Sequence, residues 1–224
     1  MATLSATELG FSHRFVAGEG PHAAITLLLL HGTGGDENDL LPLGRTLLPG
    51  AALLSPRGQV LEHGMPRFFR RLAAGVFDEE DLIARTHDLV QFVERAAAYY
   101  GRDPSRIVAV GFSNGANIAA SALLLHPGVF RAAALLRPMV PLEPHTPPRI
   151  PGTPVLIAAG RLDPIVSVAN TERLAELLRE AGARVTLRYT MAGHELGAEE
   201  VAMAQRWLAD VFSPQGEDER RDGR

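Results

Sequence analysis

Apolar runs alternate along this chain with amphipathic stretches, and short polar or glycine-rich segments separate them. Residues 25–30 are apolar except for one threonine, as expected for a central strand that is buried on both faces. Residues 78–100 repeat apolar side chains at helical spacing, which predicts a long helix with one buried face. The chain therefore reads as strands that alternate with helices after an initial pair of strands.

The expected strands cover residues 11–17, 23–30, 51–55, 107–110, 130–136, 155–159 and 185–190. The expected helices cover residues 40–48, 78–100, 116–125, 171–181 and 199–212. A turn at 18–21 joins the first two strands, and Asn38 or Asp39 is expected to cap the first helix. This order predicts an α/β protein with a mostly parallel sheet covered on both faces by helices.

No internal repeat or second domain boundary is visible, so residues 1–212 are predicted to form one domain. Residues 213–224 are charged and lack large apolar side chains, which is typical of a disordered tail. Residues 56–77 form a long segment of another kind, rich in arginine and phenylalanine. We expect this segment to lie over the mouth of a site, with exposed Phe68 and Phe69. Its arginines, at 67–71, fit a solvated loop edge better than an anion-binding patch.

The composition of the chain excludes several kinds of partner and of catalytic chemistry. The formal net charge is −4, which gives no indication of a nucleic-acid partner. Cysteine and lysine are both absent, which excludes disulfides, cysteine nucleophiles, Schiff bases and a Walker-type phosphate loop. The eight histidines show neither H-x-x-x-H nor H-E-x-x-H spacing, so we expect no metal. No signal peptide and no apolar run long enough to span a membrane are visible, so a cytoplasmic protein is expected.

A G-x-S-x-G pattern, GFSNG at 111–115, joins a β-branched apolar run to a run of helix formers. Glycines two residues before and after Ser113 allow a strand and a helix to approach closely, and the turn then exposes the serine hydroxyl as a nucleophile. The five letters alone are equally compatible with a serine that only caps the helix.

A serine hydroxyl needs a base, and an imidazole with an acidic partner is suited to this role. Asp163 follows the strand expected at 155–159, and His194 follows the strand expected at 185–190. The chain order Ser113, Asp163, His194 therefore predicts a catalytic triad. The alternative for Asp163, which precedes a proline, is a turn residue without a catalytic role.

The oxyanion formed during acyl transfer needs backbone N–H donors. We expect one donor from Asn114 at the start of a helix, and a second from Thr33 in the glycine-rich loop that follows residues 25–30. The loop sequence GTGGDE lacks the Gly-Lys-Ser/Thr ending of a phosphate-binding loop, which disfavours that alternative.

Together these segments resemble the phospholipase/carboxylesterase family of α/β-hydrolases, through LLLLHGTGGDENDLLPLG, GMPRFFRRLAAGVFDEEDL, GFSNGANIAASALLLHP, LRPMVPLEP, GRLDPIV and AGHE. The likeness is greatest to small bacterial carboxylesterases linked to hydroquinone resistance, whereas acyl-protein thioesterases and lysophospholipases are more distant. It implies an α/β-hydrolase fold without a large cap domain, Ser113, Asp163 and His194 as triad, and Thr33 and Asn114 as oxyanion donors. It also implies that the 56–77 segment contributes to the substrate pocket.

The expected function is therefore a cofactor-free serine carboxylesterase that hydrolyses short-chain esters of small molecules. Met65, Phe68 and Phe69 are the expected substrate-binding residues, and the two phenylalanines could instead serve a homodimer contact. A thioesterase or lysophospholipase with long-chain preference is the first alternative. A non-catalytic interaction protein on a hydrolase scaffold is the second, disfavoured because no triad member is missing.

Overall fold

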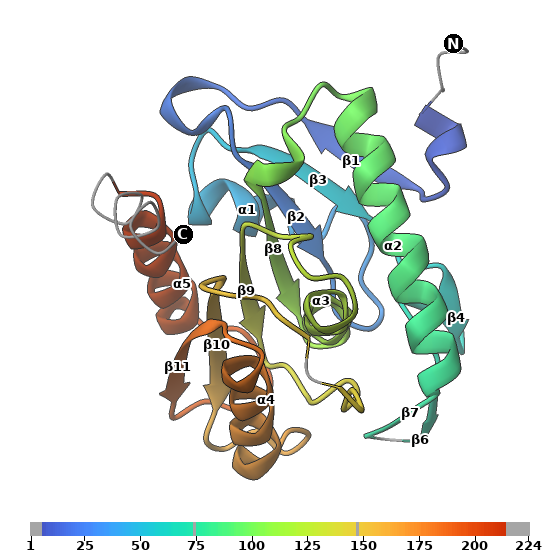
Figure 1. The fold of residues 1–224 in the computed structure, drawn as a ribbon, viewed down its shortest axis with the longest axis vertical. Coiled ribbons are helices and arrows are strands. Elements are labelled where there is room, and N and C mark those ends of the chain that lie inside the picture. The colour runs from blue at the N-terminus through green and yellow to red at the C-terminus, as the bar shows by residue number, and fades with distance from the viewer. Residues whose placement is uncertain (1–5, 74, 147, 214–224) are drawn as a thin grey trace.

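Seven strands form one twisted sheet at the centre of the molecule (Figure 1). The computed structural model describes residues 6–73, 75–146 and 148–213. Along the sheet the order is β1 (His13–Val16), β3 (Ala52–Pro56), β2 (Thr26–Leu30), β8 (Ile107–Phe112), β9 (Ala132–Leu136), β10 (Pro154–Gly160) and β11 (Arg184–Thr190). The first pair, β1 and β3, is antiparallel, and every other neighbouring pair is parallel. The predicted, mostly parallel sheet is confirmed.

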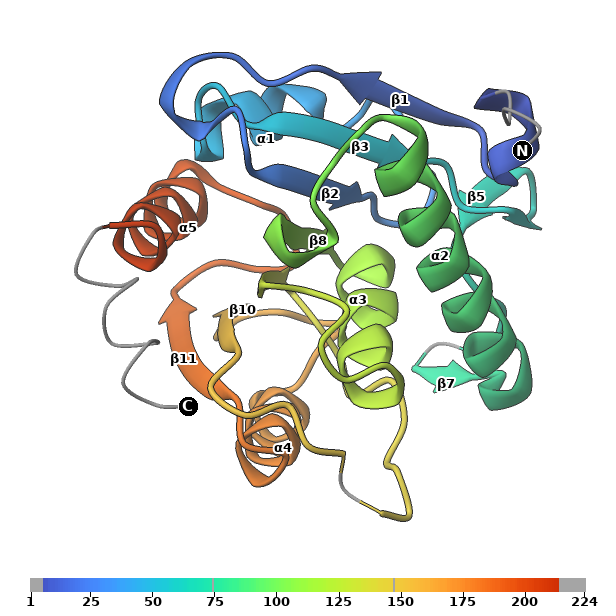
Figure 2. The same ribbon diagram turned by 45° about the horizontal axis from the view of Figure 1, so that its top comes forward.

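Helices cover both faces of this sheet (Figure 2). The helices of the described residues are α1 (Leu41–Leu47), α2 (Glu79–Tyr99), α3 (Asn114–Leu125), α4 (Val168–Glu180) and α5 (Ala198–Val211), with short 3-10 turns at Ala6–Leu9, Gly20–His22 and Pro104–Arg106. Side chains of α2, α3 and α4 contribute to one apolar core, and those of α1 and α5 contribute to a second. Strand β2 serves both cores because Leu28 and Leu30 face the first while Leu27 and Leu29 face the second.

Two local predictions near the N-terminus were wrong. The first two strands do not pair with each other, because β3 lies between them and hydrogen-bonds to both. Neither Asn38 nor Asp39 caps α1, which follows Leu40 without a side-chain cap. The backbone N–H of Asn38 instead donates to Asp36 Oδ1 at 2.7 Å, so a local turn uses these polar residues. The predicted tail lies, except for Ser213, outside the described residues.

The 56–77 segment is more regular than its sequence indicates. It forms two hairpins, β4 (Val60–Glu62) with β5 (Met65–Arg67), and β6 (Arg71–Ala73) with β7 (Val76–Phe77). Phe68 and Phe69 connect the hairpins and are 2% and 0% exposed, so the expectation of exposed rings, and of a dimer contact through them, was wrong. Both rings belong to the core of α2 and α3, and Phe69 packs edge-on against Phe77 at 5.0 Å between ring centroids.

Steric limits at the junction of β8 and α3 lead to a testable prediction. A Cβ atom at Gly115 would overlap the backbone carbonyl of Leu30, because α3 begins directly against the end of β2. We expect Gly115→Ala to lower the free energy of unfolding by about 2–3 kcal/mol, measured by urea denaturation. Gly193→Ala is the control, since its Cβ would lie 3.8 Å from the nearest atom. Equal stability of the two variants would contradict this account of the junction.

Candidate active site

Ser113 lies between β8 and α3 in a backbone conformation that few side chains adopt. Its φ and ψ are 52° and −115°, and its backbone N–H donates to the carbonyl of Leu136 in β9 at 2.8 Å. Although Ser113 occupies the N-cap position of α3, its side chain makes no capping hydrogen bond. The Ser113 hydroxyl therefore does not cap the helix, as the alternative interpretation had it. Backbone strain of this kind is characteristic of functional sites.

The three side chains predicted to form a triad lie together at the carboxyl ends of three strands. Ser113 Oγ is 2.8 Å from His194 Nε2, and His194 Nδ1 is 2.8 Å from Asp163 Oδ2. A carboxylate can only accept hydrogen bonds, so the proton of the neutral imidazole lies on Nδ1. Nε2 is then the acceptor for the serine hydroxyl, which is the arrangement that a general base requires.

The carboxylate of Asp163 serves two structural roles at once. Its Oδ1 accepts the backbone N–H groups of Ile165 at 2.8 Å and Val166 at 3.0 Å, while Oδ2 contacts the imidazole. The side chain is 1% exposed, compared with 19% for His194. Asp163 is thus both a turn residue and the partner of the imidazole. The turn holds its second carboxylate oxygen toward His194.

The loop with Thr33 and the start of α3 with Asn114 approach each other at the same edge of the sheet. A Cβ atom at Gly32 would lie 2.9 Å from the ring of Phe112, so only glycine allows this approach. The N–H of Asn114 is in the first turn of α3, where amides have no partner within the helix. The glycine-rich loop and the turn that carries Ser113 are therefore in close contact at this edge of the sheet.

Three consecutive residues of the 56–77 segment bind both of these segments. The carbonyl of Pro66 accepts from Gly34 N at 2.9 Å, Arg67 Nη1 donates to Thr33 Oγ1 at 2.7 Å, and Phe68 N donates to Asn114 Oδ1 at 2.7 Å. We call residues 66–68 the strap. The strap therefore supports the two expected oxyanion segments through its backbone and its arginine.

Within the strap, Arg67 is 3% exposed, so the expectation that arginines 67–71 form a solvated edge was wrong for it. Burial lowers the pKa of its guanidinium. Its sequence neighbours Arg70 and Arg71 do behave as expected, since both are exposed and pair with carboxylates. No local pattern separates Arg67 from these neighbours, which is why sequence reasoning missed it.

His31 joins the glycine-rich loop to the start of the 56–77 segment. Its Nδ1 donates to the carbonyl of Gly32 at 2.7 Å, and its Nε2 accepts the backbone N–H of Gly58 at 2.9 Å. Burial lowers the pKa of this imidazole, and protonation of Nε2 would remove the bond from Gly58. His31 thus acts as a neutral structural link beside the site.

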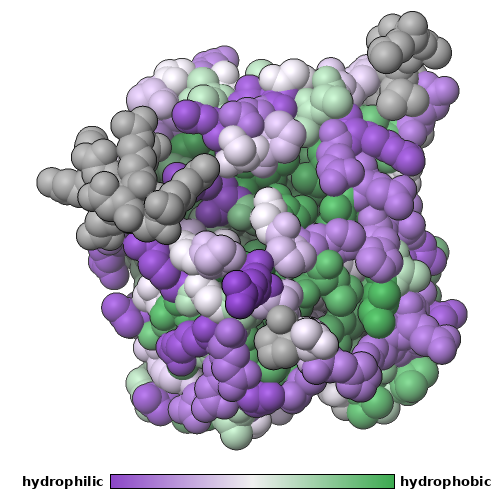
Figure 3. Space-filling view, viewed as in Figure 1, coloured by the Kyte–Doolittle hydropathy of each residue, from purple (hydrophilic) through white to green (hydrophobic). Residues whose placement is uncertain are grey.

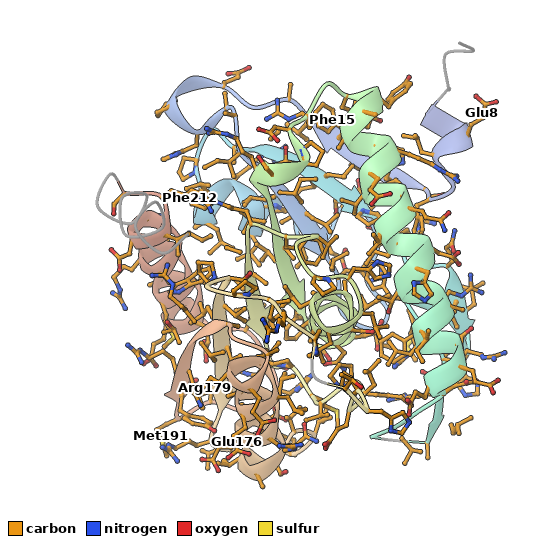
Figure 4. The ribbon with its side chains drawn as sticks, viewed as in Figure 1. Glu8, Phe15, Glu176, Arg179, Met191 and Phe212 are labelled. Atoms are coloured by element: carbon orange, nitrogen blue, oxygen red, sulfur yellow. The ribbon has the colours of Figure 1, made fainter. Side chains whose placement is uncertain are left out.

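Exposed apolar side chains occur in the 56–77 segment and in the loop that leads to His194. Met65, one of the expected substrate-binding residues, is 41% exposed, and its sulfur would lie 3.7 Å from a Cβ at Gly34. Leu72 and Val76 are exposed on β6 and β7, where Figure 3 shows a green patch. Met191, at the start of the loop that leads to His194, lies at the outer edge of the molecule (Figure 4). The rings of Phe68 and Phe69, by contrast, have almost no surface to offer a substrate.

Two wider properties of the described residues bear on the site. No group of three histidine, aspartate or glutamate side chains among them is arranged to hold a metal ion. No helix within the same residues is both long enough and apolar enough to cross a membrane.

Comparison with known proteins defines the relationships of this chain. The sequence model of the phospholipase/carboxylesterase family matches residues 12–212 of this chain. The chain belongs to this family. It is 49% identical over 186 residues to MhqD of Bacillus subtilis (strain 168), a protein named as a hydrolase, and the match covers 83% of this chain and 93% of MhqD.

Solved structures of the same family have the same architecture. The Bacillus cereus carboxylesterase is 49% identical with a TM-score of 0.87, covering 90% of this chain and 95% of its own. The carboxylesterase from Mesorhizobium loti is 36% identical with a TM-score of 0.85, and the match covers 91% of this chain and 96% of the Mesorhizobium loti chain. This member of the phospholipase/carboxylesterase family thus has the α/β-hydrolase fold and is a carboxylic ester hydrolase, as its sequence predicted.

Proposed function

We propose that this enzyme is a serine carboxylesterase that hydrolyses short-chain esters through an acyl-enzyme intermediate. The observation that carries the proposal is the continuous chain of hydrogen bonds from Ser113 through His194 to Asp163, in which the serine hydroxyl has no capping role. No cofactor is needed for this chemistry, because the side chains supply nucleophile, base and acid.

The proposed reaction has two halves. Ser113 Oγ attacks the ester carbonyl while His194 Nε2 takes its proton, and the N–H groups of Thr33 and Asn114 stabilise the oxyanion. The imidazolium then gives its proton to the departing alcohol, and Asp163 stabilises the positive charge meanwhile. Water, activated by the same imidazole, releases the carboxylic acid and restores the serine.

The preference for short acyl groups is supported by polarity at the oxyanion loop. Thr33 occupies this loop, and its hydroxyl accepts a hydrogen bond from the buried Arg67. A polar pair beside the expected oxyanion site would favour a short acyl chain over a long apolar one. A second candidate, a thioesterase or lysophospholipase, is favoured by the exposed apolar side chains of Leu72 and Val76 in the 56–77 segment.

A panel of p-nitrophenyl esters from acetate to palmitate, together with acyl-CoA thioesters and a lysophospholipid, separates these candidates. We expect kcat/KM to be highest for acetyl and butyryl esters and to fall for longer chains. A value that rises toward palmitate, or that is higher for thioesters, would replace the short-chain esterase by the second candidate. Met65→Ala should change the chain-length profile if Met65 contacts the substrate.

A further inference from the structure

Arg137, the residue after β9, is buried completely and has a strained backbone. Its side chain is 0% exposed and its φ is +56°, in the left-handed region that non-glycine residues rarely adopt. Its backbone N–H donates to the carbonyl of Ala158 in β10 at 2.8 Å. Burial of an arginine is costly unless its charge is paired and its donors are used, so the contacts of this guanidinium indicate its purpose.

The guanidinium spans the loop that carries the base. Nε donates to the carbonyl of Gly193 at 2.9 Å, and Nη2 donates to the carbonyl of Glu195 at 3.2 Å. These are the residues immediately before and after His194. Nη2 also forms an ion pair with Glu200 Oε1 at 2.5 Å.

Glu200 holds the two ends of the same loop. Its Oε1 also accepts from the hydroxyl of Thr190 at the end of β11, and its Oε2 accepts the backbone N–H of Gly197 before α5 at 2.9 Å. Burial by itself raises the pKa of the Glu200 carboxyl, but hydrogen bonds from Thr190 and Arg137 outweigh it and hold the pKa at about 2. The Glu200 carboxylate is therefore ionised at any pH at which an imidazole can act as a base.

The end of β9 also fixes the nucleophile. The carbonyl of Leu136 accepts the backbone N–H of Ser113, and the next residue along the chain is Arg137. Two consecutive residues thus contact the backbone of the nucleophile and the loop of the base. Arg137 Nη1 has no hydrogen-bond partner among the described residues, and such a buried ion pair usually adds little to stability compared with apolar side chains.

We propose that the buried Arg137–Glu200 pair is a positioning device that holds the His194 loop in register with Ser113. This inference rests on the proposed function, in which His194 is the base. Neither residue touches the substrate in this account, and both act through the backbone on either side of the imidazole. Replacing the pair by apolar side chains should spare the fold and impair the chemical step.

The decisive variant is the double substitution Arg137→Met with Glu200→Leu, which removes both charges together and leaves no unpaired ion. We expect a folded protein with a lowered melting temperature, because Gly197 N–H and the Thr190 hydroxyl lose their acceptor. KM for p-nitrophenyl butyrate should be unchanged and kcat lower by about 100-fold, the scale of a misplacement of about 1 Å. If the folded double variant keeps the wild-type kcat, the pair is purely structural and the proposal is wrong.

Two further variants keep the test decisive. Arg137→Lys retains the charge but cannot span two carbonyls and a carboxylate, so its kcat should also be lower than that of the wild type. This variant decides the question if the double variant does not fold. A wild-type kcat in Arg137→Lys would overturn the proposal. Arg102→Met is the matched control, since Arg102 donates to Thr26 Oγ1 at 2.9 Å and to the carbonyl of Ala23, away from the site. It should lower the melting temperature without lowering kcat.

The proposed function is judged separately in the same experiment. A fluorophosphonate probe should label wild-type Ser113 stoichiometrically and label the Arg137 variants at the same residue but more slowly. Failure of the wild type to react would refute the serine mechanism itself. A labelled wild type with equally fast labelling of the folded double variant would refute only the positioning role.

Discussion

Replacing Ser113 by alanine should abolish ester hydrolysis, lowering kcat by about 10⁴-fold or more, as the loss of a nucleophile that acts together with its base typically does. The proposed mechanism assigns bond formation to this hydroxyl alone, and its hydrogen bond to His194 Nε2 has no substitute in the variant. The hydroxyl makes no capping bond, so its removal should leave the fold intact. Hydrolysis of p-nitrophenyl butyrate and fluorophosphonate labelling, read by peptide mass, are the measurements.

The matched control for this prediction is Ser105→Ala. Ser105 is exposed and bonds to Asp103 in the turn before β8, so its loss should leave kcat and labelling unchanged. Retention of full esterase activity by Ser113→Ala would show that another group attacks the ester. Labelling at a different serine would identify that group.

Replacing Asp163 by asparagine should lower kcat by about 10⁴-fold while the protein stays folded, which is the scale of the same change in serine-protease triads. The amide oxygen of asparagine can still accept the backbone N–H groups of Ile165 and Val166, so the turn is retained. Its NH₂ group would then face His194 Nδ1 and donate to it, which moves the imidazole proton to Nε2. Nε2 could no longer accept the proton of the serine hydroxyl.

Asp103→Asn provides the control because it changes the same group in the same kind of turn. Asp103 Oδ1 accepts the backbone N–H of Ser105 at 2.9 Å, and no imidazole lies on its other oxygen in the described structure. We expect kcat to be unaffected there. If Asp163→Asn retains most of the activity, Asp163 is only a turn residue and another group must orient His194.

The strands and the nucleophile turn were predictable because each depends on local signals. A continuous apolar run such as residues 25–30 has few alternatives to a buried strand, and the glycines at 111 and 115 answer a steric need that no other residue type meets. The order of Ser113, Asp163 and His194 then followed from the strands that precede them. Parallel strands end at one edge of the sheet, which brings these loops together.

Buried charges and strand pairing were not predictable from the same signals. Arginine is almost always solvated in proteins, and Arg67 and Arg137 each bind a side chain far away along the chain, Thr33 for Arg67 and Glu200 for Arg137. The pairing of β1 with β3 depends on which strand has a free edge, and apolar periodicity does not encode this. Phe68 and Phe69 are buried in the core of α2 and α3 between two short hairpins, and apolar periodicity did not predict those hairpins.

The strap and its two hairpins divide one segment into parts that can evolve at different rates. Residues 66–68 contact both expected oxyanion segments, whereas the strands of the two hairpins carry the exposed side chains of Leu61, Leu72 and Val76. Under the proposed function, substitutions at these exposed positions should alter the preference for the acyl or alcohol group without disturbing the strap. Selectivity is therefore open to gradual natural or laboratory selection, while turnover is insulated from the same changes.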